Sequence, residues 1–207
     1  MKSQIKSKQR VTDHGEVFTR EQEVNAMLDL VKDETEKKDD ARYLEPACGD
    51  GNFLIEILRR RLRHIEQRYQ QSQREYEFYA VFALAGLYGI DILKDNVFAC
   101  RQRLLGYFGE QYQRLFPQHN PKVIEVARFI LSLNILHGNA LTMKYVEQDE
   151  FLHFSQWSAV SFPRKWSLKR HDFRYTDLVD YADEPYQSIQ EYQSCYFLEI
   201  ENAKKIL

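Results

Sequence analysis

The sequence predicts an α/β protein with a Rossmann-like fold, in which helices cover both faces of a mostly parallel sheet. Three short apolar segments, at 42–45, 86–91 and 134–139, alternate with stretches whose apolar residues recur at helical spacing. Each segment leads into glycine, aspartate or asparagine, residues that favour turns. This alternation of strands and helices is typical of a parallel sheet, because parallel neighbours need a crossover connection.

Length and composition favour one domain. The 207 residues, 43% of them apolar, can bury one core of ordinary size but hardly two. We expect a mobile basic arm at 1–12, a cofactor-binding core at 13–142 and a less regular extension at 143–207. Lys and Arg number 29 against 31 Asp and Glu, so the net charge of −2 creates no strong overall attraction to nucleic acids or membranes.

Cysteine usage and hydropathy indicate a cytoplasmic protein that does not enter membranes. Cys48, Cys100 and Cys195 lack metal-ligand spacing, and an odd number of thiols fits a reducing compartment. The first residues lack the apolar stretch of a secretory signal, and no segment approaches the ~18 apolar residues of a membrane span. The histidines show no metal-ligand spacing either, so we assign no metal.

Caps and periodicity define the elements of the N-terminal half. Thr19 and Gln22 have the spacing of a capping box, so a helix is expected to begin there. Its apolar residues fall on one face, namely Val24, Met27, Leu28 and Val31. After the strand at 42–45 and a glycine turn, helical spacing resumes from Leu54 to Ile65. We place the arginines of this helix, at 59–61 and 63, on its outer, solvated side.

The rest of the core is assigned in the same way. The apolar run at 79–84 is interpreted as helix because a strand candidate lies directly behind it. Further helices are expected around Val97–Phe108 and Val123–Leu131. The second of these follows the turn Asn120-Pro121.

The extension contains a basic segment rich in aromatic residues. Trp157 to Trp166 fits a strand pair around Pro163, and 175–206 fits one or two helices. Its cations are interleaved with aromatic residues, as phosphate contacts and base stacking require: Arg164, Lys165, Lys169, Arg170 and Arg174. The segment is therefore a candidate DNA-binding site, although a charge run of this length also fits a solvated surface.

The ends of the three predicted strands carry the residues suited to bind a ligand. In an open parallel sheet, ligands bind outside the carboxyl ends of the strands. Gly49 and Gly51 allow close approach of the backbone, Asp91 is placed to accept hydrogen bonds from ribose hydroxyls, and Asn139 suits the edge of an adenine. These features describe a pocket for an adenosine with a charged tail. Taken alone, the glycines also fit a structural turn, and Asp91 fits a helix cap.

The charge of the first turn discriminates between adenosine ligands. A dinucleotide fingerprint needs a small residue where Leu54 stands, and Asp50 would repel a pyrophosphate. No Gly-Lys-Ser/Thr follows the glycines, which excludes a Walker-type phosphate loop. The sulfonium of S-adenosylmethionine tolerates acids such as Glu45 and Asp50 far better. The sequence therefore favours S-adenosylmethionine over NAD.

Four segments resemble the ordered motifs of S-adenosylmethionine-dependent adenine-specific DNA methyltransferases. They are Gly15-Glu16-Val17-Phe18-Thr19, Leu44-Glu45-Pro46-Ala47-Cys48-Gly49-Asp50-Gly51-Asn52-Phe53, Tyr88-Gly89-Ile90-Asp91 and His137-Gly138-Asn139-Ala140-Leu141. The resemblance spans residues 10 to 142 and is closest to short restriction-modification M-subunit-like proteins. It implies a cofactor site formed by Phe18, Thr19, Glu45, Ala47, Gly49, Gly51, Asp91, Ile92 and Asn139.

The same resemblance implies a role for most of these residues. Phe18 and Thr19 would line the methionine end, while Glu45 and the two glycines would cradle the amino acid moiety. Asp91 would hold the ribose, and Ile92 and Asn139 would flank the adenine. The sequence departs from the family pattern at Arg20, where proline is usual, and at Asn139, where aspartate is usual.

A catalytic loop of the family type is not recognisable. Members that methylate an amine follow the last motif with Asn/Asp-Pro-Pro-Tyr/Phe, and this sequence has no such string. The nearest imitation makes Asp183 and Tyr186 catalytic candidates, and the same residues also fit a helix start with Pro185 in its first turn. We therefore expect little methylation by the isolated chain. A partner polypeptide could supply the loop, or the chain could be a non-catalytic cofactor-binding or DNA-binding subunit or a truncated relic.

Overall fold

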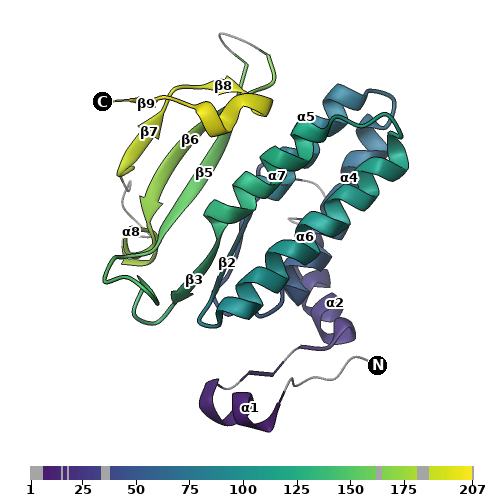
Figure 1. The fold of residues 1–207 in the computed structure, drawn as a ribbon. Helices are drawn as coiled ribbons and strands as arrows, with labels where there is room; N and C mark the ends of the chain where they lie inside the picture. The colour runs from purple at the N-terminus through teal and green to yellow at the C-terminus, as the bar shows by residue number, and fades with distance from the viewer. Residues whose placement is uncertain are drawn as a thin grey trace.

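The structure is a computed structural model that describes residues 7–14, 16–17, 19–33, 38–161, 165–180 and 187–206. It contains a four-stranded sheet, a group of long helices packed against it and a five-stranded antiparallel sheet (Figure 1). The chain is thus a mixed α/β protein. None of its described helices is long and apolar enough to cross a membrane.

The first sheet has the predicted parallel core. Its strands are β1 (Tyr43–Glu45), β2 (Leu87–Asp91), β3 (Ile135–Asn139) and β4 (Lys144–Tyr145), in the order β1-β2-β3-β4. The first three are parallel, and β4 runs antiparallel to β3. In the register, Glu45 lies opposite Gly89, and Asp91 lies opposite His137. The carboxyl ends of the three parallel strands therefore meet at one edge, as the sequence predicts.

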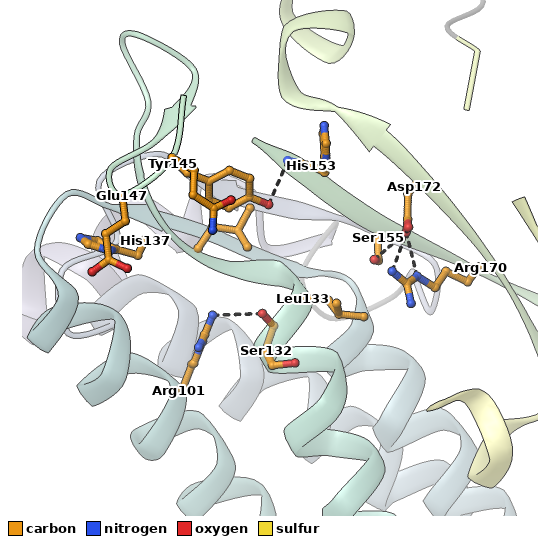
Figure 2. A pocket seen from close by; sticks show the side chains of 12 residues that line it. Arg101, Ser132, Leu133, His137, Tyr145, Glu147, His153, Ser155, Arg170 and Asp172 are labelled. Carbon is orange, nitrogen blue, oxygen red and sulfur yellow. Dashed lines mark hydrogen bonds and ion pairs between the residues drawn. The ribbon is translucent and has the colours of Figure 1, made fainter. Parts of the chain in front are cut away.

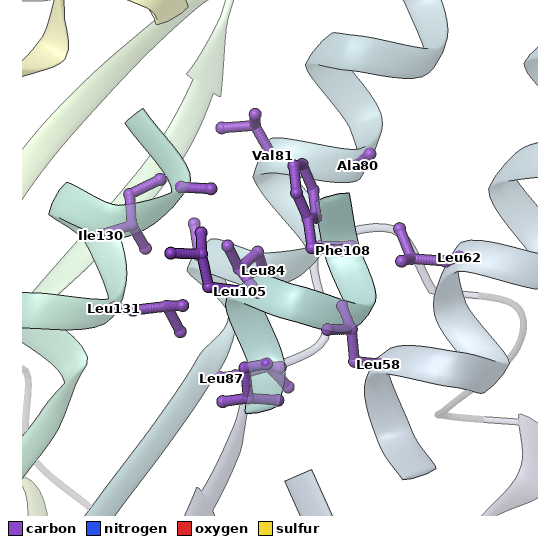
Figure 3. Close-up of a cluster of buried hydrophobic side chains, with 14 of the residues drawn as sticks. Leu58, Leu62, Ala80, Val81, Leu84, Leu87, Leu105, Phe108, Ile130 and Leu131 are labelled. Atoms are coloured by element: carbon purple, nitrogen blue, oxygen red, sulfur yellow. The ribbon is translucent and has the colours of Figure 1, made fainter. Parts of the chain in front are cut away.

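Four helices connect the parallel strands. Helices α4 (Asn52–Tyr69) and α5 (Gln73–Ala85) lie between β1 and β2, whereas α6 (Lys94–Leu115) and α7 (Pro121–Asn134) lie between β2 and β3. The predicted helix at 79–84 is confirmed as part of α5. Asn120, predicted to be part of a turn ahead of a helix, is the N-cap of α7, and its side chain accepts a hydrogen bond from the Lys122 amide. Figure 3 shows the apolar core that these helices share with β2, including Leu58, Leu84, Leu87, Phe108 and Ile130.

The second face of the parallel sheet differs from the prediction of helices on both faces. Tyr88 and Ile90, which alternate with the helix-facing Leu87, pack in a separate cluster with Leu152, Phe154 and Tyr175. The Tyr88 and Phe154 rings meet edge to face at 5.4 Å. These partners come from the antiparallel part of the chain, apart from Tyr175 at the start of the short helix α8 (Tyr175–Asp180). In the described residues, long helices therefore cover one face only.

Two arginines of α4 are buried rather than solvated, which corrects the sequence prediction for 59–61. Arg60 and Arg61 are 6% and 3% exposed. Arg61 donates to the carbonyls of Asp39, Ala41 and Ala83, so it ties the segment before β1 to the end of α5. Burial lowers the pKa of Arg61, but the three carbonyls satisfy its charged donors. A run of arginines predicts a solvated face only when no backbone carbonyls approach it.

The N-terminal segment also differs from its predicted form. Residues 1–6 lie outside the described residues, but α1 (Lys8–His14) is helical, and Arg10 binds Glu16 and Asp95 rather than belonging to an arm. Helix α2 (Glu21–Asp29) begins two residues after Thr19, because the backbone N–H of Arg20 donates to Glu23 at 3.0 Å. On its predicted apolar face, Val24 and Leu28 are buried, whereas Met27 and Val31 are exposed.

The extension forms the antiparallel sheet. The predicted strand pair is confirmed by β5 (His153–Val160) and β6 (Ser167–Arg174), which pair along their whole length. The prediction of one or two helices over 175–206 is wrong for most of that range. After α8 come β7 (Gln190–Tyr192), β8 (Cys195–Tyr196), a 3-10 helix η1 (Phe197–Asn202) and β9 (Lys205–Ile206). Pairing with β6 and burial of Phe197 and Ile200 outweigh the local helix propensity.

Candidate functional site

The carboxyl ends of β1, β2 and β3 border a cavity of about 530 Å³, which we call the strand-end pocket. Residues from four separate segments line it, around positions 16–19, 45–53, 91–96 and 138–141. These are the four segments that carry the family resemblance. The pocket includes most of the predicted cofactor-binding residues, namely Thr19, Glu45, Ala47, Gly49, Asp91, Ile92 and Asn139.

Two predicted residues are not placed in the pocket. Phe18 lies outside the described residues. Gly51 has a left-handed backbone with a φ of 90°, and a Cβ added there would lie 2.7 Å from the Sγ of Cys100 on α6. The structure therefore explains the glycine at 51 by packing against α6, whereas Gly49 lies at the pocket wall.

Asp91 organises the turn between β1 and α4. Its Oδ2 accepts a hydrogen bond from the Gly49 amide at 2.9 Å. Its Oδ1 accepts from the Leu93 amide at 2.8 Å and from the Asn96 side chain at 3.2 Å. Asp91 is not a helix cap, because the N-cap of α6 is Leu93. A carboxylate has about four acceptor positions, so one remains on Oδ2 for a ligand.

The acids of the first turn have different surroundings. Asp50, expected to favour a cationic ligand, forms an ion pair with Arg103 of α6 at 2.7 Å and does not line the pocket. Glu45 does line it, accepts only the Ala47 amide at 3.2 Å, and has no cation partner among the described residues. Asp91 is likewise bonded to amides and not to a cation. The pocket thus contains two carboxylates whose charge no described side chain neutralises.

Glu16 adds a third carboxylate that sequence reasoning did not assign. Its side chain is 7% exposed, is bound by Arg10 and accepts from Asn96 at 2.7 Å. Asn96 also donates to Asp91, so a hydrogen-bonded chain connects the N-terminal segment to the end of β2. Glu16 and Asn52, which also line the pocket, lie in segments that the family resemblance includes, so the resemblance was the signal that could have found them. The apolar rim residue Leu141, which is 92% exposed, lies in the fourth of these segments, whereas no local pattern marked Asn96.

Asn139 and Cys48 have local structural roles. The side-chain oxygen of Asn139 accepts from the amides of Leu141 and Thr142, which closes the turn after β3. Cys48 is buried, and the neighbouring Cys100 thiol together with burial holds the pKa of Cys48 far above its usual value. A protonated thiol is a poor nucleophile, so Cys48 acts as a small spacer in the turn.

The catalytic candidates and the basic segment are placed only in part. Asp183, Tyr186 and Arg164 lie outside the described residues. Of the described cations, Lys165 precedes β6, and Lys169, Arg170 and Arg174 lie on this strand, whose side chains alternate between two faces. Lys169 is paired with Glu191 at 3.0 Å, and Arg170 with Asp172 at 2.7 Å. Lys165 lies 4.3 Å above the Trp166 ring, and Arg174 is exposed.

Comparison with known proteins gives no relative. No protein-family model, no curated protein and no solved structure is significantly similar to the chain. Across the residues that the structure describes, no three His, Cys, Asp or Glu side chains are grouped as metal ligands would be. The function must therefore be argued from the pocket itself.

Proposed function

We propose that the chain binds S-adenosylmethionine in the strand-end pocket and is an adenine-specific (N6) DNA methyltransferase-like protein of a restriction-modification or phage system. The observation that carries the proposal is the pair of carboxylates, Glu45 and Asp91, that face one cavity without a cation partner among the described residues. Uncompensated carboxylates favour a cationic ligand.

Size and chemistry of the pocket support this ligand. A volume of about 530 Å³ lies within the ~300–1,000 Å³ of pockets for drug-sized molecules. The two carboxylates would attract a sulfonium and an ammonium group, and they would repel the phosphates of a nucleotide. Ile92, 42% exposed, offers an apolar surface beside Asp91 for a base. The residues present therefore fit S-adenosylmethionine better than NAD or ATP.

The chain's own residues would divide the binding between them. Glu45 would attract the ammonium group of the methionine end. The remaining acceptor position of Asp91 would take one ribose hydroxyl while its other bonds keep the Gly49 turn in place. When bound, the cofactor supplies an activated methyl group on a positively charged sulfur. An adenine amine could then attack that methyl directly, so the protein's main task would be to align the reactants.

A second candidate is a non-catalytic subunit that binds the cofactor or DNA. This candidate is favoured because polar side chains at the pocket already have hydrogen-bond partners within the chain. Asn139 and Asp91 are already engaged by backbone amides, and the described lining residues offer no Asn/Asp-Pro-Pro loop to hold a target amine. A partner polypeptide that supplies this loop is part of the same proposal.

Calorimetric titration with S-adenosylmethionine tests the donor site. Glu45→Gln keeps an oxygen for the Ala47 amide and removes only the charge, so we expect affinity to fall about tenfold, or about 1.4 kcal/mol. Glu110→Gln, at an exposed position of α6, is the matched control and should bind like the unmodified chain. S-adenosylhomocysteine, which lacks the sulfonium charge but keeps the ammonium group, should lose about as much affinity in Glu45→Gln as S-adenosylmethionine does. Absence of saturable binding to the unmodified chain would refute the proposal.

Transfer of a tritiated methyl group to adenine-containing DNA separates the two candidates. Methylated DNA from the chain alone supports the enzyme. Cofactor binding without transfer supports the non-catalytic subunit, and transfer that begins only with a partner polypeptide locates the loop on that partner.

A further inference from the structure

A second cavity, of about 350 Å³, lies between the parallel and antiparallel parts of the molecule (Figure 2). Helices α6 and α7, strand β3, the chain around β4, and strands β5 and β6 each contribute to its wall. We call it the inter-sheet pocket. No residue lines both this pocket and the strand-end pocket.

Arg101 of α6 has a positive charge at this pocket that no described carboxylate neutralises. Its Nε and Nη2 donate to the carbonyls of Ile135 and Ser132 at the end of α7. Its Nη1 has no partner among the described residues. Because its guanidinium is partly removed from water, burial lowers the pKa of Arg101. Capping of α7 thus accounts for two of its three nitrogens.

Comparison with Arg61 shows what is unusual about Arg101. Arg61 is buried, whereas Arg101 is half-buried, and neither has a carboxylate partner among the described residues. Both Nη atoms of Arg61 donate to carbonyls, and Arg61 lines neither pocket. Backbone carbonyls therefore satisfy the charged donors of Arg61. Arg101 instead keeps one NH₂ group unused beside a cavity, where a ligand has room to bind.

The carboxylates of the inter-sheet pocket are already neutralised. Asp172 accepts two hydrogen bonds from Arg170, at 2.7 and 2.8 Å, and further ones from Ser155 and Tyr192. Glu147 is paired with Lys94 at 2.8 Å. Each of these acids thus has its own cation, Arg170 in the lining and Lys94 outside it, so the charge of Arg101 is left without a counter-ion among the described residues.

Two further donors at the pocket are unused. Arg170 binds Asp172 through Nε and Nη2, which leaves its Nη1 without a described partner. The Tyr145 oxygen accepts the His153 amide at 3.4 Å, and its own O–H donates to no described group. Figure 2 shows Arg101 and Arg170 reaching the cavity from different walls, with Tyr145 above Arg101. Guanidinium and hydroxyl donors beside an unpaired positive charge match the oxygens of a phosphate.

We propose that the inter-sheet pocket binds a phosphate group at the unused Nη1 of Arg101. The phosphate can belong to a small phosphate monoester or to a nucleic-acid backbone, since the donors recognise the same oxygens in both. This site is independent of the S-adenosylmethionine proposal, because the two pockets share no lining residue and favour opposite charges.

Ser132 offers a test that leaves Arg101 in place. It is exposed, lines the pocket and contacts Arg101 only through its backbone carbonyl. Ser132→Glu adds a negative charge beside the guanidinium, whereas Ser132→Gln adds nearly the same volume without charge. Both lose the same hydrogen bond from the Ser132 hydroxyl to the Phe129 carbonyl, so they differ in charge alone.

Binding of inorganic phosphate is measured by calorimetry at constant ionic strength, with chloride as the competing anion. We expect saturable binding to the unmodified chain and to Ser132→Gln, and at least a tenfold loss in Ser132→Glu. Adenosine monophosphate and a short DNA duplex then distinguish the sources. The true source binds more tightly than inorganic phosphate and shows the same loss in Ser132→Glu.

Two results would overturn the proposal. One is the absence of saturable phosphate binding to the unmodified chain. The other is equal binding by the Glu and Gln variants, which would place the phosphate elsewhere. Urea unfolding of both variants confirms that they are folded, so a loss of binding cannot be mistaken for a loss of structure.

Discussion

Replacement of Gly51 by alanine tests why a glycine occupies this turn. With a φ of 90°, the backbone at Gly51 is left-handed, a conformation that costs a residue with a side chain ~1–2 kcal/mol. The new Cβ would also lie 2.7 Å from the Sγ of Cys100, which is fully buried. Overpacking in a core costs ~1–3 kcal/mol. We therefore expect Gly51→Ala to lower the free energy of unfolding by about 2–5 kcal/mol.

A double-mutant cycle with Cys100→Ala separates the two contributions. Without the sulfur, the nearest remaining atom of residue 100 is its Cβ, at 3.4 Å from the added methyl group. Gly51→Ala should then cost only the backbone strain, roughly 1–2 kcal/mol. Urea unfolding followed by circular dichroism gives all four stabilities. If Gly51→Ala costs the same in both backgrounds, within about 0.5 kcal/mol, packing against Cys100 is not the reason for the glycine.

Three further predictions concern buried charges and tyrosines. Arg61→Ala should lower the free energy of unfolding, measured by urea unfolding, by about 3 kcal/mol because it leaves three carbonyls without their donor. The control Arg63→Ala, at an exposed position of the same helix, should change the free energy of unfolding by less than about 0.5 kcal/mol. Arg170→Ala should destabilise the chain because it leaves Asp172 without its cation, whereas Arg174→Ala, at an exposed position, should leave stability unchanged. If Arg174→Ala loses DNA binding while it stays stable, Arg174 contacts DNA directly. Burial, with help from the hydrogen bond to Glu77, raises the pKa of Tyr112 to about 12, so the unfolded chain loses this proton at a lower pH than the folded one. The stability gained from a neutral Tyr112 is present below about pH 10 and is lost as the pH rises toward 12. In Tyr112→Phe, the unfolding midpoint should therefore depend less steeply on pH between about pH 9 and 11.5. An unchanged slope of midpoint against pH would contradict this assignment.

The parallel half of the fold could be predicted because its signals are local. Helices α4 and α7 each repeat apolar residues over several turns, and the strands between them are bounded by turn residues. The strand-end pocket follows from that topology, since parallel strands place Glu45, Asp91 and Asn139 at one edge. Signals that are local in sequence were thus enough to predict a site whose residues come from distant segments.

The antiparallel half could not be predicted from the same signals. Strands β7, β8 and β9 have two or three residues each, too few to show the alternation that marks a strand. The burial of Arg60 and Arg61 depends on where α2 and the end of α5 approach α4, which no local pattern encodes. The same is true of the inter-sheet pocket, whose residues extend from Arg101 to Asp172. The patterns that include His137 and Arg170 give no sign that these residues share a pocket with Arg101.

The two proposals assign ligands of opposite charge to two pockets that are close neighbours. His137 lines the inter-sheet pocket, and its Nε2 lies 3.1 Å from the carbonyl of Ile92, which lines the strand-end pocket. The carboxylates of Glu45 and Asp91 exclude a phosphate from one side of this contact, and the Arg101 guanidinium repels a sulfonium on the other. Phosphate at saturation should therefore not displace S-adenosylmethionine, and Ser132→Glu should bind the cofactor like the unmodified chain. Direct competition between the two ligands would mean that they share one site, and the division of charge between two pockets would be wrong.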